Sequence, residues 1–257
     1  MKQVLGRIRR ADQDFKLFRS GDRVMVGLSG GKDSMVLMTA LATYRNFSDE
    51  PFTLCAGMVR MGFPDFDTTE LEEYCRTIDV PLYFKDTRIG PIVFETRKES
   101  NPCALCAKMR RGSLNELAQR HGCNKVALGH HRDDLTETLL MSMLYESRLR
   151  TFSPITWLDR ADIVQIRPMI YLPEAHIASV CRRLSLPTCK NPCPASGNTK
   201  RQEMKDLLAH LGTLCPDAHN HIFMAIKNTD QYGLWDAIKA RPDEPANGAL
   251  VKREEAN

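Results

Sequence analysis

A short run of small and charged residues at 29–34, with the sequence SGGKDS, constrains this chain more than any other stretch. It follows the apolar residues 24–28 and precedes the apolar residues 35–38, which predicts a strand, a glycine turn and a helix. Glycines let the backbone turn tightly toward a ligand, and the helix N-terminus offers N–H groups and a positive dipole. The run therefore predicts a phosphate site, with Lys32 as a mobile cation and Asp33 as a ligand for Mg²⁺.

The spacing differs from that of the P-loop of kinases and GTPases, in which four residues separate a glycine from Gly-Lys-Ser or Gly-Lys-Thr. Here Lys32 is followed by an aspartate. The run resembles the PP-loop of N-type ATP pyrophosphatases, which split ATP into AMP and pyrophosphate and use the AMP to activate a substrate oxygen. A plain serine–glycine turn without a ligand is the alternative interpretation.

The composition is that of a globular protein, with 42% hydrophobic and 26% charged residues in a chain of 257. This length allows one large α/β domain, or one domain with a small appendage. No apolar stretch reaches the ~18–20 residues of a membrane span. The first ten residues lack the apolar core of a signal peptide, so we expect no membrane association and a cytoplasmic location. The net charge of +4 is compatible with RNA binding but does not require it.

Strand and helix patterns alternate along the chain. Residues 3–20 predict an amphipathic helix. Strands are expected at 24–28, 52–59, 82–85, 125–128 and 163–166, and helices at about 33–46, 68–78, 105–121 and 132–146. This alternation indicates βαβ units, and therefore an α/β fold with a Rossmann-like parallel sheet covered by helices on both faces.

The same patterns suggest four parts. They are an N-terminal helix over residues 1–20, an ATP pyrophosphatase domain over 21–172, a small helical C-terminal segment over 173–238 that is interrupted at 187–197, and a tail over 239–257. The tail carries prolines, a glycine and many charges, so we expect it to be disordered.

Ligands of such sheets bind beyond the carboxyl ends of the strands, where residues 29–34 and 129–134 both fall. In the second segment Gly129 would let the backbone approach a nucleotide. His130 and His131 could polarise a carbonyl or hold phosphate, and Asp133 or Asp134 could cap the helix or assist Mg²⁺. A helix cap formed by an aspartate, with solvated charges around it, is the alternative. Arg167 also ends a strand, where it could hold phosphate or RNA or lie on the surface without a role.

Nine cysteines in a chain expected to be cytosolic are poor candidates for disulfides, so close spacings among them indicate metal or redox chemistry. Cys103 and Cys106 form a C-x-x-C, which could be a redox pair, part of a zinc site, part of an iron–sulfur cluster, or two structural thiols. Cys189 and Cys193 form a second, wider-spaced pair. The remaining cysteines are expected in the core: Cys55, Cys75, Cys123, Cys181 and Cys215.

Further motifs follow in order. They are the C-x-x-C, residues 108–112 (KMRRG), 127–134 (ALGHHRDD) and 166–171 (IRPMIY), and Cys193 ahead of Arg201. Together with the PP-loop, and over roughly residues 5–235, this set resembles the tRNA 2-thiocytidine synthetase family. The resemblance implies a tRNA sulfurtransferase that adenylates C2 of an anticodon-loop cytidine with ATP and Mg²⁺. It also implies that the oxygen is then replaced by sulfur through a [4Fe–4S] cluster, with AMP and pyrophosphate as the other products.

The resemblance also assigns residues to roles. It implies a cluster held by Cys103, Cys106 and Cys193, ATP bound by Ser29, Gly30, Gly31, Lys32, Asp33, Ser34, Gly129, His130 and Asp133, and catalytic roles for Lys32, Asp33 and Cys193. The implied partners are tRNA and a cysteine desulfurase as sulfur donor, and a homodimer is possible. The basic residues near the C-x-x-C add RNA contacts at Arg110 and Arg111, with Arg167 as a third, although a solvated charged face would look the same.

Two other functions fit parts of this pattern. A ligase of the lysidine-forming kind activates the same base atom but has no use for three cysteines. A non-catalytic iron–sulfur or zinc protein could bind RNA while retaining the fold. If Cys189 were a fourth ligand, an open cluster would become a closed one.

Overall fold

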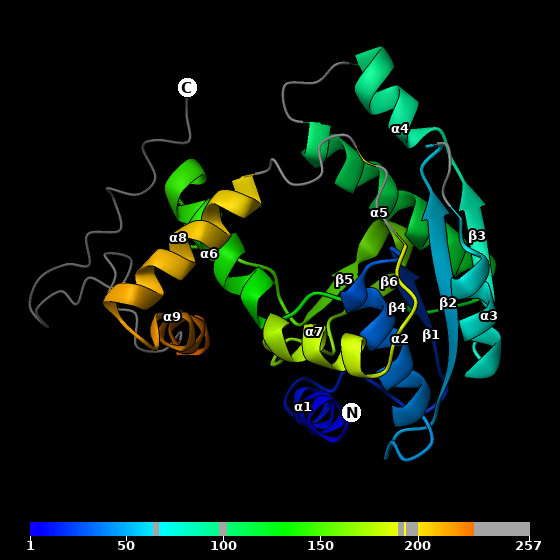
Figure 1. The fold of residues 1–257 in the computed structure, drawn as a ribbon. Coiled ribbons are helices and arrows are strands. Elements are labelled where there is room, and N and C mark those ends of the chain that lie inside the picture. Colours follow the sequence, from blue (N-terminus) through cyan, green and yellow to red (C-terminus); the bar gives the residue numbers. More distant parts are fainter. Residues whose placement is uncertain (64–66, 98–101, 190–192, 194–199, 229–257) are drawn as a thin grey trace, which may run out of the picture. The chain divides into compact units, whose positions relative to one another are not determined.

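The computed structural model describes residues 1–63, 67–97, 102–189, 193 and 200–228. Its sheet contains six strands in the order β3-β2-β1-β4-β6-β5 (Figure 1). The strands are β1 (Asp22–Leu28), β2 (Phe52–Arg60), β3 (Leu82–Asp86), β4 (Lys125–Ala127), β5 (Ile155–Leu158) and β6 (Ile163–Ile166). The first four and β6 pair in parallel, as the alternation of elements predicted.

The edge strand β5 departs from the prediction, because it was not expected and it runs antiparallel to β6. It is four residues long and connects to β6 through the short 3₁₀ helix η2 (Asp159–Ala161). Its burial alternates between exposed and half-buried residues, and Trp157 is 66% exposed. Isoleucine, threonine and tryptophan all favour strands, but a segment of four residues is too short to stand out as an alternating pattern, so its pairing with β6 identifies it.

Helices cover both faces of the sheet. On one face α5 (Pro102–Arg120) packs against β2, β3 and β4 through a core that includes Leu114, Leu117 and Ala118. On the other face α2 (Lys32–Tyr44) packs against β1 and β2 and also contacts α1 (Lys2–Phe15) and α7 (Glu174–Arg183). Helix α2 is buried along almost its whole length, which explains its nearly continuous apolar sequence.

The other helices are shorter or lie later in the chain. They are α3 (Thr69–Thr77), α4 (Ile89–Pro91), the π-helical turn η1 (Ile92–Arg97), α6 (Arg132–Glu146), α8 (Lys200–Leu214) and α9 (Ala218–Lys227). The helix over 89–97 was not predicted. The first helix ends at Phe15 rather than near residue 20, because Lys16 adopts a left-handed conformation with φ of 52°.

Contacts divide the chain into two units, Met1–His219 and Asn220–Asn257. The described part of the second unit is the rest of α9 and Asn228. The domain limits drawn from the sequence stay predictions, and the tail at 239–257 lies outside the described residues. Within the described residues, no helix is long and apolar enough to cross a membrane.

Candidate nucleotide site and thiol cluster

The run 29–34 spans the turn between β1 and α2, with residues 29–31 in the turn and the rest in the first turn of α2. Gly30 has φ of +78°, a left-handed conformation that favours glycine. The hydroxyl of Ser29 accepts a hydrogen bond from the Gly31 N–H at 3.3 Å, and the Ser34 hydroxyl donates to the Gly31 carbonyl at 2.9 Å. These serine bonds fix the turn and leave the first N–H groups of α2 facing outward, since no intrahelical acceptor exists for them.

Gly129 brings the end of β4 against the start of α2. A Cβ atom at this position would lie 3.1 Å from the Ser34 nitrogen and 3.2 Å from the carbonyl carbon of Asp33. Both neighbours are backbone atoms at the N-terminus of a buried helix, so they have little freedom to move. Gly129 thus serves the close approach of two backbone segments beside the phosphate site.

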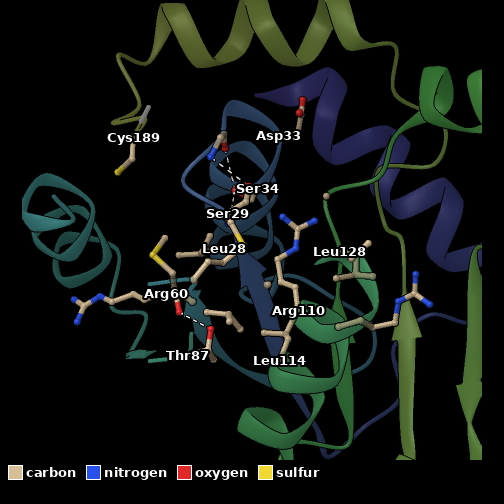
Figure 2. A pocket seen from close by; sticks show the side chains of 18 of the residues that line it. Leu28, Ser29, Asp33, Ser34, Arg60, Thr87, Arg110, Leu114, Leu128 and Cys189 are labelled. Carbon is tan, nitrogen blue, oxygen red and sulfur yellow. Dashed lines mark hydrogen bonds between the residues drawn. The ribbon is translucent and has the colours of Figure 1, made fainter. Parts of the chain in front are cut away.

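A cavity of about 860 Å³ opens at the carboxyl ends of β1 to β4 (Figure 2). One wall is polar and comes from the PP-loop, through Ser29, Gly31, Asp33 and Ser34. Another is apolar and comes from the strand ends and α5, through Leu28, Met58, Leu114 and Leu128. Figure 2 shows Arg110 extending from α5 toward the loop. The combination suits a ligand with a flat apolar ring at one end and phosphates at the other.

Lys32 points away from this cavity, toward α7. Its Nζ lies 2.8 Å from Glu174 Oε1 and 3.2 Å from Asp33 Oδ2. Burial lowers the pKa of Lys32, but the bond to Glu174 and the charge of Asp33 outweigh it, so the net pKa is raised. The Lys32 ammonium is therefore held by carboxylates here, and its contact with ATP stays a prediction.

Asp33 has one carboxylate oxygen available for a ligand. Oδ1 is buried and has no hydrogen-bond partner among the described residues. Lys32 Nζ lies 3.2 Å from it but outside hydrogen-bonding geometry, and His131 Nε2 lies 3.8 Å away. An orphaned carboxylate oxygen beside a phosphate-binding turn fits a hard cation such as Mg²⁺.

His130 lines the cavity at the end of β4. Burial lowers its pKa to about 4; the charge of Asp134 opposes this shift, and the charges of Arg167 and Arg201 add to it. Its ring packs against Phe152, with the ring centroids 4.9 Å apart. The imidazole is thus neutral at ordinary pH and can donate or accept one hydrogen bond to a nucleotide.

Asp133 and Asp134 were both considered as helix caps and as ligands for Mg²⁺, and their positions differ. Asp134 lines the cavity and accepts the His131 N–H at 2.9 Å, so it caps α6. Asp133 accepts the Glu174 N–H at 2.6 Å, so it caps α7, and it does not line the cavity. Burial raises the pKa of Asp133, but His219 and the Glu174 N–H outweigh this and bring it to about 2. The structure therefore places Asp134, rather than the predicted Asp133, at the cavity.

The Cys106 thiol lies within electrostatic range of both Cys103 and Cys193. Burial raises the pKa of Cys106, and after the opposing effect of Arg110 the charges of Cys193 and Cys103 raise it further. Cys103 is exposed and the other two are half-buried. No three His, Cys, Asp or Glu side chains among the described residues are arranged to hold one metal ion.

A four-iron cluster places different demands on its ligands than a single ion does. Each thiolate binds a different iron, so the three sulfurs stand farther apart than ligands that share one ion. Cys103 and Cys106 belong to the first turns of α5, at a spacing that puts both on one helix face. The three thiols fit such a cluster in donor chemistry and in neighbourhood.

Cys189 lies elsewhere, over the PP-loop. Its N–H donates to the Gly30 carbonyl at 2.9 Å, and its thiol donates to the Asp67 carbonyl at 3.3 Å. It lines the nucleotide cavity, as Figure 2 shows. The sequence offered Cys189 as a possible fourth cluster ligand; its position places it in the wall of the cavity, and a role as a cluster ligand stays a prediction.

The five cysteines expected in the core are mostly there. Cys75, Cys123 and Cys181 are buried and Cys55 is half-buried, with the Cys55 and Cys123 sulfurs 3.5 Å apart. Cys215 is exposed near the end of α8, so that expectation was wrong. Helix α8 ends at Leu214, so Cys215 lies just beyond the helix in which it was expected.

The three arginines predicted to bind RNA occupy two kinds of position. Arg110 and Arg111 are exposed and line the cavity from α5. Arg167 is only 7% exposed, which excludes the surface alternative, and its Nη1 donates to the Ser153 carbonyl at 2.6 Å. Its guanidinium therefore holds the chain after α6 in place, and its RNA contact stays a prediction.

Helix α8 is tied to the nucleotide site by ion pairs that sequence patterns did not reveal. Arg201 Nη1 lies 2.8 Å from Glu137 Oε2 and 3.2 Å from Asp134 Oδ1. Lys205 Nζ lies 2.9 Å from Glu174 Oε2, on the carboxylate that also holds Lys32. Glu137 is 1% exposed. A glutamate in the middle of a predicted helix gives no sign of burial, so only the packing of α8 on α6 identifies it.

Arg60 also lines the cavity, although no sequence motif identified it. Its guanidinium stacks over Phe84 at 3.8 Å, and its carbonyl accepts the Thr87 hydroxyl at 2.8 Å. The signal that could have found it is its position at the carboxyl end of β2, next to the strand that carries the PP-loop.

The fold and the loop define the class of this protein. A PP-loop domain model matches residues 5–210, so the chain belongs to the PP-loop family. Within that class it belongs to the tRNA-cytidine(32) 2-sulfurtransferase family, which confirms the resemblance seen in the sequence. The relative from Pelobacter propionicus is 35% identical over 230 residues, covering 88% of this chain and 86% of its own. The relative from Syntrophotalea carbinolica is 36% identical, covering 89% of each.

Solved structures support the fold independently. The U34-tRNA thiolase NcsA from Methanococcus maripaludis, solved with its [4Fe–4S] cluster, has a TM-score of 0.72 at 23% identity. The match covers 89% of this chain and 78% of that one. NMN synthetase from Francisella tularensis has a TM-score of 0.50 at 13% identity, covering 91% and 97%. At these identities the likeness shows a shared fold.

Proposed function

We propose that this protein is an enzyme that uses ATP to replace the C2 oxygen of an anticodon-loop cytidine in tRNA with sulfur. The observation that carries the proposal is a contact between the two halves of the site. The Cys106 thiol lies 3.7 Å from Met61 Sδ, and Met61 lines the nucleotide cavity. Cys106 therefore lies beside the cavity that we assign to ATP, which supports a single site shared by ATP and the thiol trio of Cys103, Cys106 and Cys193.

ATP activation falls to the PP-loop wall of the cavity. The C2 oxygen of the base attacks the α-phosphorus, the bond to the β-phosphate breaks, and pyrophosphate leaves. The N–H groups of the first turn of α2 stabilise the charge that develops on the phosphate. Asp33 Oδ1 would hold Mg²⁺, and Lys32 would reach the phosphates after leaving Glu174. The oxygen then departs as AMP when sulfur takes its place.

The thiol trio supplies the second half of the reaction. Cys103, Cys106 and Cys193 would hold a [4Fe–4S] cluster, and the chemistry that the cluster would supply when bound is delivery of sulfur to the activated base. Arg110 and Arg111, on the same helix as two of these ligands, bind the phosphates around the target nucleotide.

The finer features of the reaction are also proposals. Sulfur comes from a cysteine desulfurase, the protein works in the cytoplasm, and a homodimer is its possible assembly. The catalytic domain spans residues 21–172, with an N-terminal helix over 1–20 and a helical segment over 173–238. In a lysidine-type ligase the three cysteines would have no function. In a non-catalytic RNA-binding relative the PP-loop would have none.

Pyrophosphate release tests the activation step. Holoenzyme with ATP, Mg²⁺ and tRNA is expected to release pyrophosphate only when tRNA is present, and Asp33→Asn should slow it by about 100-fold or more. Asp79→Asn is a matched control, because Asp79 is 99% exposed in its side chain. Release without tRNA, or an unaffected Asp33→Asn variant, would contradict the proposed activation.

A further inference from the structure

The C-terminal end of α6 and the chain after it expose an unusual set of side chains. Residues 143–150, here called the α6 exit segment, are all exposed. Four are large and apolar, with exposed fractions of 43% for Met143, 58% for Leu144, 51% for Tyr145 and 57% for Leu149. Contiguous exposed apolar side chains on a soluble protein indicate a surface that binds something.

The α6 exit segment is held in one conformation. Ser147 ends the helix with φ of 53°, and the N–H groups of Ser147 and Arg148 both reach the Ser142 carbonyl. This closes the helix end as a Schellman motif does. A few residues later the Thr151 hydroxyl donates to the Leu135 carbonyl at 3.2 Å. A segment fixed at both ends presents its side chains with little entropy left to lose on binding.

The segment leads directly to the mouth of the nucleotide cavity. Phe152 packs its ring 4.9 Å from that of His130, which lines the cavity. Arg167 lies over the same ring at 5.0 Å. Burial and, to a smaller extent, the charge of Arg111 lower the pKa of Arg167 to about 10, so Arg111 on the cavity rim is near. The exit segment and the arginines of α5 thus flank one opening.

The segment carries one net positive charge, which favours binding of a polyanion. Arg148 and Arg150 are exposed and form no ion pair within the described residues, whereas the one carboxylate of the segment, Glu146, accepts a hydrogen bond from the Ser142 hydroxyl at 3.4 Å. Guanidinium groups bind phosphate oxygens through paired hydrogen bonds, and apolar and aromatic side chains beside them give bases a surface to stack on. A two-fold interface formed by this segment would gather the arginines of both copies into one contact area, and like charges there repel one another.

We propose that the α6 exit segment is an RNA-binding platform beside the cavity. Arg148 and Arg150 bind backbone phosphates next to the target nucleotide, and Leu149 contacts a neighbouring base. The platform orients the RNA strand so that one base turns into the cavity between it and Arg110. This inference rests on the proposed tRNA substrate, and it assigns a second RNA contact to residues outside the motifs.

Binding of unmodified tRNA transcript to holoenzyme, measured at several salt concentrations, tests the platform. Arg148→Gln with Arg150→Gln should raise Kd about tenfold or more and reduce the salt slope by roughly 1.5, because two phosphate contacts are lost. Leu149→Ser should raise Kd by a few fold with the slope unchanged. ATP affinity and iron content should stay at wild-type values in all variants.

Arg182→Gln with Arg183→Gln is the matched control, since both arginines are exposed on α7 and the same charge is removed. The proposal is overturned if this control weakens tRNA binding equally, or if the Arg148 and Arg150 variant binds like wild type. It is also overturned if that variant instead changes the oligomeric state in sedimentation. Because binding is scored separately from thiolation, tight platform-dependent binding without product would contradict the proposed reaction and leave the platform standing.

Discussion

Lys32 Nζ and Glu174 Oε1 lie 2.8 Å apart, so the PP-loop lysine is paired with the first residue of α7. Lys205 of α8 binds the same carboxylate, with Nζ 2.9 Å from Oε2. Burial raises the pKa of Glu174, but the two ammonium groups outweigh it and bring it to about 2. The pair is therefore charged at any ordinary pH, and ATP must compete with Glu174 for Lys32.

Removing this competitor should strengthen ATP binding. Glu174→Gln frees Lys32 from a partly exposed ion pair worth about 0.5–1 kcal/mol, so the Kd for ATP should fall by roughly 2- to 5-fold. Isothermal titration with a non-hydrolysable ATP analogue measures this. Glu116→Gln removes a charge on the exposed surface of α5 and should leave the Kd unchanged. Weaker binding in Glu174→Gln would mean that Lys32 needs Glu174 to be positioned.

Gly129 should not tolerate a side chain. Gly129→Ala places a methyl group 3.1 Å from the Ser34 nitrogen, so the loop must shift. We expect a loss of about 1–3 kcal/mol in the free energy of unfolding and a weaker ATP complex. Urea denaturation and ATP titration measure the two effects. Gly212→Ala in α8 is the control, because no atom lies within 4 Å of its Cβ position, and it should stabilise the helix slightly.

His130 should make stability depend on pH in the mildly acidic range. Its pKa is about 4 in the folded protein and about 6.5 when unfolded. Between these values the unfolded chain binds a proton that the folded chain does not. The stabilisation is complete above pH ~6.5 and is lost as the pH falls toward 4, by about 1–3 kcal/mol.

Denaturation of wild type and His130→Asn from pH 7 to 4.5 tests this. The slope of the unfolding free energy against pH should be smaller in His130→Asn, and His210→Asn at an exposed position of α8 should behave like wild type. Equal slopes in wild type and His130→Asn would show that another group is responsible.

The parallel sheet and the phosphate site could be read from the sequence because local patterns encode them. Long apolar runs mark the buried strands, and the two glycines before α2 indicate a tight turn at the start of a helix. The split between Asp133 and Asp134 could not be read, because it depends on where α7 begins relative to α6. Glu174 was missed for the same reason, since its role exists only after α7 packs against α2.

The cysteines show the same division. The spacing of Cys103 and Cys106 is local, so the sequence identified the pair from residue types alone. Their association with Cys193 was inferred from the family resemblance, because no local pattern between residues 106 and 193 shows that the chain comes back to the C-x-x-C. The place of Cys189 over Gly30 depends on a backbone hydrogen bond between distant segments, which no periodicity encodes.

Iron content should separate the cysteines by role. In anaerobically reconstituted protein, Ser in place of Cys103, Cys106 or Cys193 should lower bound iron and the cluster absorbance strongly. Cys189→Ser should keep both, because its thiol bonds to Asp67 over the ATP site. Loss of iron in Cys189→Ser would instead make it the fourth ligand and close the cluster to sulfur.

The most direct test of the proposed reaction is nucleoside mass spectrometry of the tRNA product. Reconstituted holoenzyme is incubated without oxygen with unmodified tRNA, ATP, Mg²⁺ and a sulfide source, and the tRNA is digested and separated. We expect a cytidine of the anticodon loop to gain one sulfur and lose one oxygen, with one AMP formed for each 2-thiocytidine, and no product without ATP. Unchanged cytidine in tRNA, while bound iron and ATP cleavage are intact, would contradict the assignment.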